Sequence, residues 1–110
     1  MEAKDLEMFS EVPFLFWVKD EAGRYLWGNR AICRLAGEDI AGKTDYDLVW
    51  SDNAESLQAA DRQVFASGNP IYLQEHVDAS SRGKATLNVC KWLGEFNGDT
   101  RCFGISFTIE

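Results

Sequence analysis

The segment Gly37–Thr44, GEDIAGKT, has the spacing GxxxxGK[ST] of a phosphate-binding loop. Such a loop follows a buried strand and opens a helix, so that its backbone amides face the phosphates. Here the preceding residues 30–36 form a helix-type segment, and Glu38 and Asp39 would place negative charge inside an anion site. We therefore predict that this segment is a turn and a connection, and that it binds no nucleotide.

His76 is the only histidine, so Ser–His–Asp or Cys–His catalysis would depend on it. It alternates with Gln74 in a strand-like run, which predicts a side chain facing solvent or lying on the sheet. The three cysteines lack CxxC spacing and are predicted to be small core residues, at Cys33, Cys90 and Cys102. Paired carboxylates such as Asp45 and Asp47 stand in polar loops. We predict neither an enzyme nor a metal site.

Composition excludes further classes of function. The chain has 110 residues, enough for one domain, and a net charge of −7 from 18 acidic and 11 basic residues. The basic residues are scattered singly, which argues against nucleic acid as a partner. Apolar runs fall short of the roughly 20 residues of a membrane span, and the first residues, MEAKDLEMF, do not form a signal peptide. A cytoplasmic location without membrane contact is expected.

The elements that would position functional residues begin with a hairpin. Two β-forming runs, 14–19 and 24–28, flank the polar turn Asp20–Gly23. Asn29 then precedes the helix-forming segment Arg30–Ala36, where its side chain can cap the helix. The chain therefore opens as strand, turn, strand and capped helix.

The second half contains one longer helix and three strands. Residues 38–50 hold two short helical turns, and Asp52 with Glu55 is spaced as a capping box for a helix that Gly68 ends. The strands are predicted at Ile71–Val77, Lys84–Phe96 and Asp99–Ile109. Asn97-Gly98 between the last two is a strong hairpin signal. Without a βαβ rhythm, this order predicts an α+β fold with an antiparallel sheet and helices on one side.

Five motifs in this order resemble a PAS domain, a sensory module of bacterial signalling proteins. They are Asp20-x-x-Gly23 with Asn29, Gly37, the segment Gly42–Leu48, Asp61-x-x-Val64-x-x-x-Gly68, and Gly104-Ile105-Ser106. The likeness runs from about Val12 to the end. It departs from the family at Thr108-Ile109-Glu110, where PAS domains commonly carry an Asp-Ile-Thr-like motif before an output linker.

The resemblance implies a five-stranded antiparallel sheet of order 2-1-5-4-3 with helices packed on one face. It divides the chain into an N-terminal flanking helix, 1–11, and a sensory domain, 12–110. The implied function is signal sensing within a larger bacterial protein, such as a histidine kinase, a cyclic-dinucleotide enzyme or a chemoreceptor. The alternatives are a ligand-free dimerisation module and a haem-based gas sensor. The identity of a ligand and of the effector domain is left open.

In PAS domains a small ligand lies between the inner sheet face and the helices that follow the second strand. On the sheet, the expected lining residues are Phe16, Val18, Trp27, Val89, Lys91, Phe103 and Ile105. On the helical side, they are Ile32, Leu35, Tyr46, Leu48, Trp50, Leu57 and Val64. Asn29, Tyr46 and Lys91 are the expected polar anchors. Since the first two strands are apolar on both faces, a slip of one residue would exchange the inner and outer sets.

Haem and flavin are not expected. Haem-binding PAS domains ligate iron through a histidine on a helix, and residues 53–67 contain none. Flavin-binding relatives carry their reactive cysteine later in the fold than Cys33. A homodimer is expected instead, because the N-terminal segment is too short for an independent helix and too apolar for solvent. Its interface residues would be Leu6, Met8, Phe9 and Val12.

Overall fold

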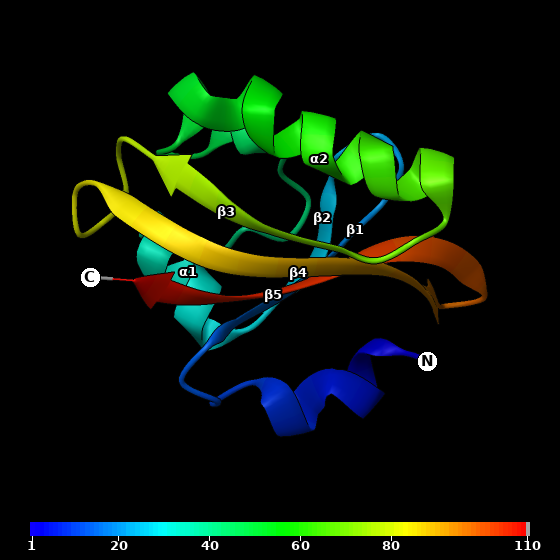
Figure 1. The fold of residues 1–110 in the computed structure, drawn as a ribbon. Coiled ribbons are helices and arrows are strands. Elements are labelled where there is room, and N and C mark those ends of the chain that lie inside the picture. The colour runs from blue at the N-terminus through cyan, green and yellow to red at the C-terminus, as the bar shows by residue number, and fades with distance from the viewer. Residues whose placement is uncertain (110) are drawn as a thin grey trace.

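The computed structural model describes residues 1–109 of the chain (Figure 1). Glu110, the last residue of the predicted terminal motif, lies outside the described residues. The helical elements are three 3₁₀ helices, η1 (Ala3–Phe9), η2 (Asp45–Asp47) and η3 (Ser51–Asn53), and two α-helices, α1 (Arg30–Ala36) and α2 (Ala54–Ser67). The strands are β1 (Leu15–Lys19), β2 (Tyr25–Gly28), β3 (Ile71–Val77), β4 (Ala85–Phe96) and β5 (Asp99–Ile109).

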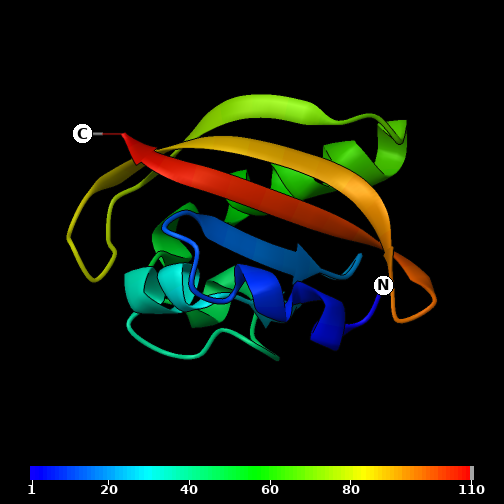
Figure 2. The same cartoon turned by 90° about the horizontal axis from the view of Figure 1, so that it is seen from below.

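The five strands form one antiparallel sheet of order β2-β1-β5-β4-β3, which confirms the predicted topology. The last two strands are long and pair along their whole length, from Thr86 opposite Ile109 to Phe96 opposite Asp99. Helix α2 lies on one side of this sheet and η1 on the other (Figures 1 and 2). The chain ends lie at opposite ends of the sheet, the N-terminus beside the β4–β5 turn, where Asn97 donates its backbone N–H to Met1 O.

Local signals produce both hairpins. Asp20 Oδ1 accepts the backbone N–H groups of Ala22 and Arg24 at 3.0 and 2.9 Å, and Gly23 supplies the positive φ of 84° that closes the turn. In the β4–β5 turn, Asn97 and Gly98 have φ of 53° and 88°, as a tight two-residue hairpin loop requires.

Asn29 joins three parts of the chain. Its Oδ1 accepts from Ile32 N, which caps α1 as predicted, and from Phe16 N in β1, both at 3.2 Å. Its Nδ2 donates to Phe9 O and Phe14 O at 3.0 and 2.9 Å. Both donors and both acceptor positions of this buried amide are used, so Asn29 fixes the N-terminal segment, β1 and α1 relative to one another.

The helical connection confirms one sequence interpretation and corrects another. Gly37–Thr44 runs from α1 to η2 rather than from a strand into a long helix, as predicted. The capping box at Asp52 is wrong, because Asp52 lies within η3 and Asn53 takes the N-cap position of α2. Glu55 instead accepts from Tyr46 Oη and Arg62 on the surface.

The outer face of the sheet, opposite α2, carries an apolar cluster that η1 covers. Leu6 is fully buried there with Phe16, Val18, Phe96 and Phe103, and partly buried side chains pack around them. Phe16 is the aromatic centre, with edge-on contacts to Trp27 at 5.7 Å and Phe103 at 6.4 Å between ring centroids. The N-terminal helix therefore docks on the sheet of its own chain.

We predict that Leu6→Ala lowers the free energy of unfolding by about 2–5 kcal/mol, because it removes the side chain that anchors η1. Met8→Ala, in the same helix but 77% exposed, is expected to change it by less than about 0.5 kcal/mol. Urea denaturation monitored by tryptophan fluorescence measures both. Equal effects of the two substitutions would show that η1 does not dock in solution.

Candidate ligand cavity

Strand β1 contributes to both faces of the sheet because all five of its residues are buried. Leu15 and Trp17 belong to the inner cluster with α1 and α2, whereas Phe16 and Val18 belong to the outer cluster under η1. Lys19 continues the inner set, so a lysine ends a strand row that is otherwise apolar. Its position inside the protein demands charged partners.

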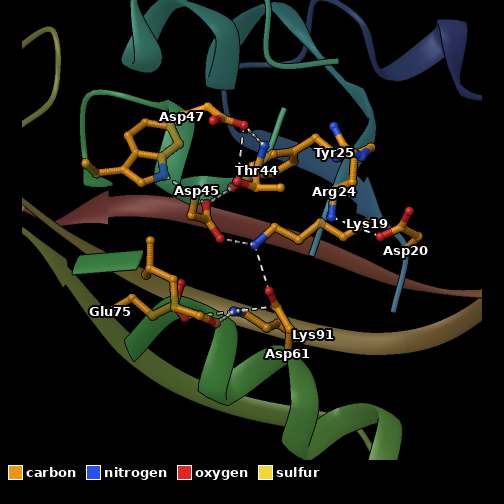
Figure 3. Close-up of polar contacts among 12 residues, drawn as sticks. Lys19, Asp20, Arg24, Tyr25, Thr44, Asp45, Asp47, Asp61, Glu75 and Lys91 are labelled. Atoms are coloured by element: carbon orange, nitrogen blue, oxygen red, sulfur yellow. Dashed lines mark hydrogen bonds and ion pairs between the residues drawn. The ribbon is translucent and has the colours of Figure 1, made fainter. Parts of the chain in front are cut away.

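Lys19 lies between two carboxylates from different elements (Figure 3). Its Nζ donates to Asp45 Oδ2 of η2 at 2.6 Å and to Asp61 Oδ2 of α2 at 2.7 Å, and all three side chains are at most 4% exposed. The ammonium group also lies 4.6 Å from the centroid of the Tyr25 ring. Lys19 thereby links β1 to η2 and to α2.

A second lysine extends the cluster along the sheet. Lys91 Nζ of β4 donates to Asp61 Oδ1 at 2.8 Å and to Leu57 O at 3.3 Å. It also lies 2.7 Å from Glu75 Oε2 of β3. This last contact is a buried ion pair, and Lys91 is the one charged partner of the Glu75 side chain within residues 1–109.

Asp45 is held by neutral donors as well. Its Oδ1 accepts from Tyr25 Oη at 2.7 Å and from Trp50 Nε1 at 2.9 Å. With Lys19 on Oδ2, this fully buried carboxylate has three hydrogen bonds. Asp45 and Asp61 are thus fully engaged, and Glu75 is the acid of the cluster with acceptor capacity left.

Burial and pairing act on these groups in opposite directions. Burial opposes the charge of Lys19, but Tyr25, Asp61 and Asp45 outweigh it and raise the pKa of Lys19 well above its usual value. Burial also opposes the charge of Asp61, yet Lys19 and Lys91 lower the pKa of that carboxyl. At Glu75 burial outweighs Lys91, and the pKa of this carboxyl is raised. Asp61 is therefore the firmly ionised centre of the cluster, and Glu75 its weakest acid.

A small cavity adjoins the cluster between the inner sheet face and the helices. Its volume for water-sized groups is about 30 Å³, room for roughly two such groups. Its wall is formed by Leu15, Trp17, Lys19, Tyr25, Ile32, Leu35, Trp50, Leu57, Glu75, Val77, Leu87 and Lys91. The cavity therefore combines an apolar and aromatic wall with charged groups along one side, as small-molecule sites commonly do.

Trp17 supplies an unpaired polar atom in this wall. Its Nε1 has no hydrogen-bond acceptor within residues 1–109, although the side chain is only 4% exposed. The indole lies against Gly104 of β5, where an added Cβ would come within 2.3 Å of the ring. Glycine at 104 is thus what allows the indole to lie flat on the sheet beside the cavity.

A larger cleft of about 320 Å³ lies elsewhere, between the N-terminal connection and α1. Its charged residues, Glu11, Arg30, Arg34 and Arg82, are all exposed. Because it contains no buried polar cluster, the smaller inner cavity is the better candidate site.

The structure brings five of the predicted lining residues to the cavity wall: Ile32, Leu35, Trp50, Leu57 and Lys91. Leu48 and Val89 lie in the inner apolar cluster around it, and Val64 is fully buried without lining the cavity. Their role in binding a ligand stays a prediction.

Five predicted residues occupy the wrong face for an inner cavity: Phe16, Val18, Trp27, Phe103 and Ile105 all lie in or against the outer cluster. Their assignment to the inner face is corrected here. The cause is strand parity, because β1 is apolar at every position before Lys19 and either alternation satisfies its hydrophobic pattern. β5 pairs with β1 in register, Val18 opposite Phe103 and Phe16 opposite Ile105, so the error in one strand is repeated in the other.

Two of the three predicted polar anchors are also misplaced. Asn29 has its hydrogen-bonding capacity filled by backbone groups, and Tyr46 is 53% exposed with its hydroxyl on Glu55. Only Lys91 reaches the cavity.

The other residues that the sequence offered for catalysis or metal binding lie away from the cavity wall. His76 is exposed on β3, where its ring nitrogens contact Thr86 Oγ1 at 3.2 Å and Asp78 Oδ1 at 3.1 Å. Cys102 is buried, and burial raises the pKa of its thiol to about 12, which keeps it protonated. Residues 1–109 contain no cluster of His, Cys, Asp and Glu suited to a metal ion. None of the helices in this range is both long and apolar enough to span a membrane.

Sequence reasoning missed most of the charged cluster, namely Lys19, Asp45, Asp61 and Glu75. A signal for Asp61 was available, since it shares the apolar face of α2 with Leu57 and Val64 at helical spacing. Glu75 alternates in the same way with Leu73 and Val77 in β3. Charged residues on an otherwise apolar face predict a buried ionic site.

Comparison with known proteins agrees with this geometry. The family model described as "PAS fold" matches residues 9–106. The chain belongs to the PAS family. A diguanylate cyclase of Vibrio cholerae is 30% identical over 79 residues, which cover 69% of this chain and 25% of that enzyme. The chain thus spans about a quarter of this larger relative.

Solved structures share the fold at low identity. VqmA, in a structure bound to DPO, superposes with a TM-score of 0.82 at 18% identity, over 96% of this chain and 57% of that one. The PAS domain of RpfR from Cronobacter turicensis, in complex with BDSF, gives 0.73 at 13% identity, over 92% and 98% of the two chains. These likenesses show the fold alone.

The charged cluster predicts an asymmetry between its acids. Asp61→Asn is expected to destabilise the protein by about 3–5 kcal/mol, because two buried lysines lose their shared carboxylate. Glu75→Gln is expected to be neutral or stabilising at about pH 8, since it removes the acid whose ionisation burial opposes.

The pH dependence has a defined sign. A raised pKa in the folded state means that protonated Glu75 favours folding below the ordinary value of 4.5, and that this contribution is lost as the pH rises through the folded pKa. The stability of wild type relative to Glu75→Gln is therefore expected to increase from about pH 8 down to about pH 5. Urea titrations at both pH values measure this. A large loss of stability in Glu75→Gln at about pH 8 would contradict this account of the cluster.

Proposed function

We propose that this PAS domain is the sensory module of a larger bacterial signalling protein and binds a small ligand in the inner cavity. The observation that carries the proposal is the cavity itself, where the unpaired indole N–H of Trp17 and the carboxylate of Glu75 adjoin an apolar wall. Its role is sensing rather than catalysis, and any enzymatic activity would belong to another domain.

The comparisons support this choice over a purely structural module. The diguanylate cyclase relative is about four times the length of the matched region, which fits a sensory domain attached to an effector. VqmA and RpfR were both solved with small ligands. VqmA also binds DNA, so the expected lack of nucleic-acid binding stays a prediction that rests on the charge of −7.

The size of the cavity points to a mechanism. A ligand of more than about two water-sized groups fits only if the wall moves. The wall is made from residues of α1, α2 and the inner face of the sheet. Binding would therefore select a second packing of these elements, and its differential affinity for the two packings would set the response.

A blocking substitution tests the site. A small-molecule screen by thermal unfolding is expected to find compounds that raise the melting temperature of wild type by several degrees. Leu57→Phe should abolish this stabilisation, because the larger ring fills the cavity from α2. Leu26→Phe places the same substitution on the outer face and serves as the control. Stabilisation that persists in Leu57→Phe would place the ligand elsewhere.

The second candidate function is dimerisation through the outer face. Apolar side chains remain exposed there, with Tyr72 78%, Met8 77% and Phe107 53% exposed. A shallow groove of about 410 Å³ runs between Tyr72, Ile105 and Phe107. Of the predicted interface residues, Leu6 and Phe9 pack on their own sheet and Val12 is half-buried. An interface would therefore use Met8 with the exposed strand residues.

We predict a dimer in sedimentation velocity at high micromolar concentration, and we expect Phe107→Glu to dissociate it by placing a charge in the interface. Val49→Glu, at an exposed valine between η2 and η3, is the matched control. A wild-type monomer at this concentration would exclude the dimerisation function.

A further inference from the structure

The buried charges of the inner face do not balance. Among the described residues the buried charged side chains are two lysines and three acids: Lys19, Lys91, Asp45, Asp61 and Glu75. With all five ionised, the cluster carries one negative charge in excess. Buried charge without a partner is costly, so the excess favours a further positive group.

The excess resides at Glu75. Asp45 and Asp61 each receive a hydrogen bond on both oxygens. The Glu75 side chain has a single charged partner within residues 1–109, Lys91 Nζ at 2.7 Å from Oε2, and Lys91 also donates to Asp61 and Leu57. Glu75 is 8% exposed and lines the cavity, so its free acceptor capacity is available to a group inside it.

The aromatic part of the cavity wall also favours a positively charged group. Trp17, Tyr25 and Trp50 all line the cavity, and the faces of aromatic rings attract cations. Lys19 already uses the Tyr25 ring in this way. An anion would add a second negative charge to the cluster and would meet these rings unfavourably.

We infer that the inner cavity selects a small organic cation, whose ammonium or protonated ring N–H donates to Glu75 while its remainder lies against the tryptophans. This inference rests on the proposed ligand-binding function and specifies the chemical class of the ligand. A neutral molecule of the same size would leave the excess charge uncompensated, and an anion would add to it.

Methylammonium is the matched probe, because its two non-hydrogen atoms correspond to the two water-sized groups that the cavity admits. A ligand of this size binds with a Kd on the order of 10 mM at best, so titrations at about pH 7.5 run to about 100 mM. Formate serves as the anionic probe and sodium chloride as the control for ionic strength. The readout is the indole N–H resonance of Trp17, assigned through its absence in Trp17→Phe.

Methylammonium is expected to give a saturable shift of the Trp17 resonance, whereas formate and sodium chloride give none. Glu75→Gln should weaken the binding at least tenfold. Glu7→Gln removes an equal charge from exposed η1, on the opposite side of the sheet, and should leave binding unchanged. Equal responses to methylammonium and sodium chloride, saturable binding of formate, or unaltered binding in Glu75→Gln would each overturn the inference.

A neutral apolar probe separates this inference from the proposed function. Xenon under pressure needs space but no charge. If xenon shifts the resonances of Leu57 and Leu87 while methylammonium does not bind, the cavity is a ligand site but does not select cations. If neither probe binds, both the inference and the proposed function fail.

Discussion

The structure depends on the hydrogen bonds of Lys19 to Asp45 and Asp61. These three side chains come from β1, η2 and α2, and Lys91 adds β4 through Asp61. Because charges in a protein interior must stay paired, none of these elements can move away without leaving a buried ion alone. The cluster thus holds η2 and α2 against the sheet, as apolar contacts usually do, but through hydrogen bonds of fixed direction. It also forms the charged side of the cavity wall, and the remaining wall residues are apolar or aromatic.

Two apolar clusters on opposite faces share the strand β1. Trp17 belongs to the inner cluster, and its neighbours Phe16 and Val18 belong to the outer one beneath η1. In the proposed function, a ligand that displaces the Trp17 indole from Gly104 would therefore act on the strand that also supports the N-terminal helix. The connection is short, since adjacent residues of one strand touch the cavity and the apolar cluster beneath η1. It requires only two packings of β1 that differ by a small free energy.

Five of the twelve residues in the cavity wall followed from the sequence. Ile32 and Leu35 were found because the cap at Asn29 and Gly37 fix the register of an apolar stripe in α1. Leu57 was found because it shares an apolar face of α2 with Ala60 and Val64, and Trp50 lies in the connection before that helix. Lys91 was found because β4 alternates clearly between buried and more exposed positions. The remainder could not be found in this way. Each acid of the cluster stands in a different element, and the hydrogen bonds to Asp45 and Asp61 join residues 26 to 42 positions apart.

The sequence by itself determined the elements and their order. Turn chemistry at Asp20–Gly23 and Asn97–Gly98, the cap at Asn29 and the glycines after both α-helices act over a few residues, so they fix local structure before any tertiary contact forms. Only the tertiary structure decided which face of β1 points inward, because apolar residues on both faces satisfy either alternation. Phe16 lies on the outer face, where β1 pairs with β5 and η1 docks. Lys19 and Trp17 lie on the inner face, where Asp45 and Asp61 bind the lysine. Burial of charge is a property of the assembled fold, since a lysine finds its two carboxylates only when three separate elements have packed together.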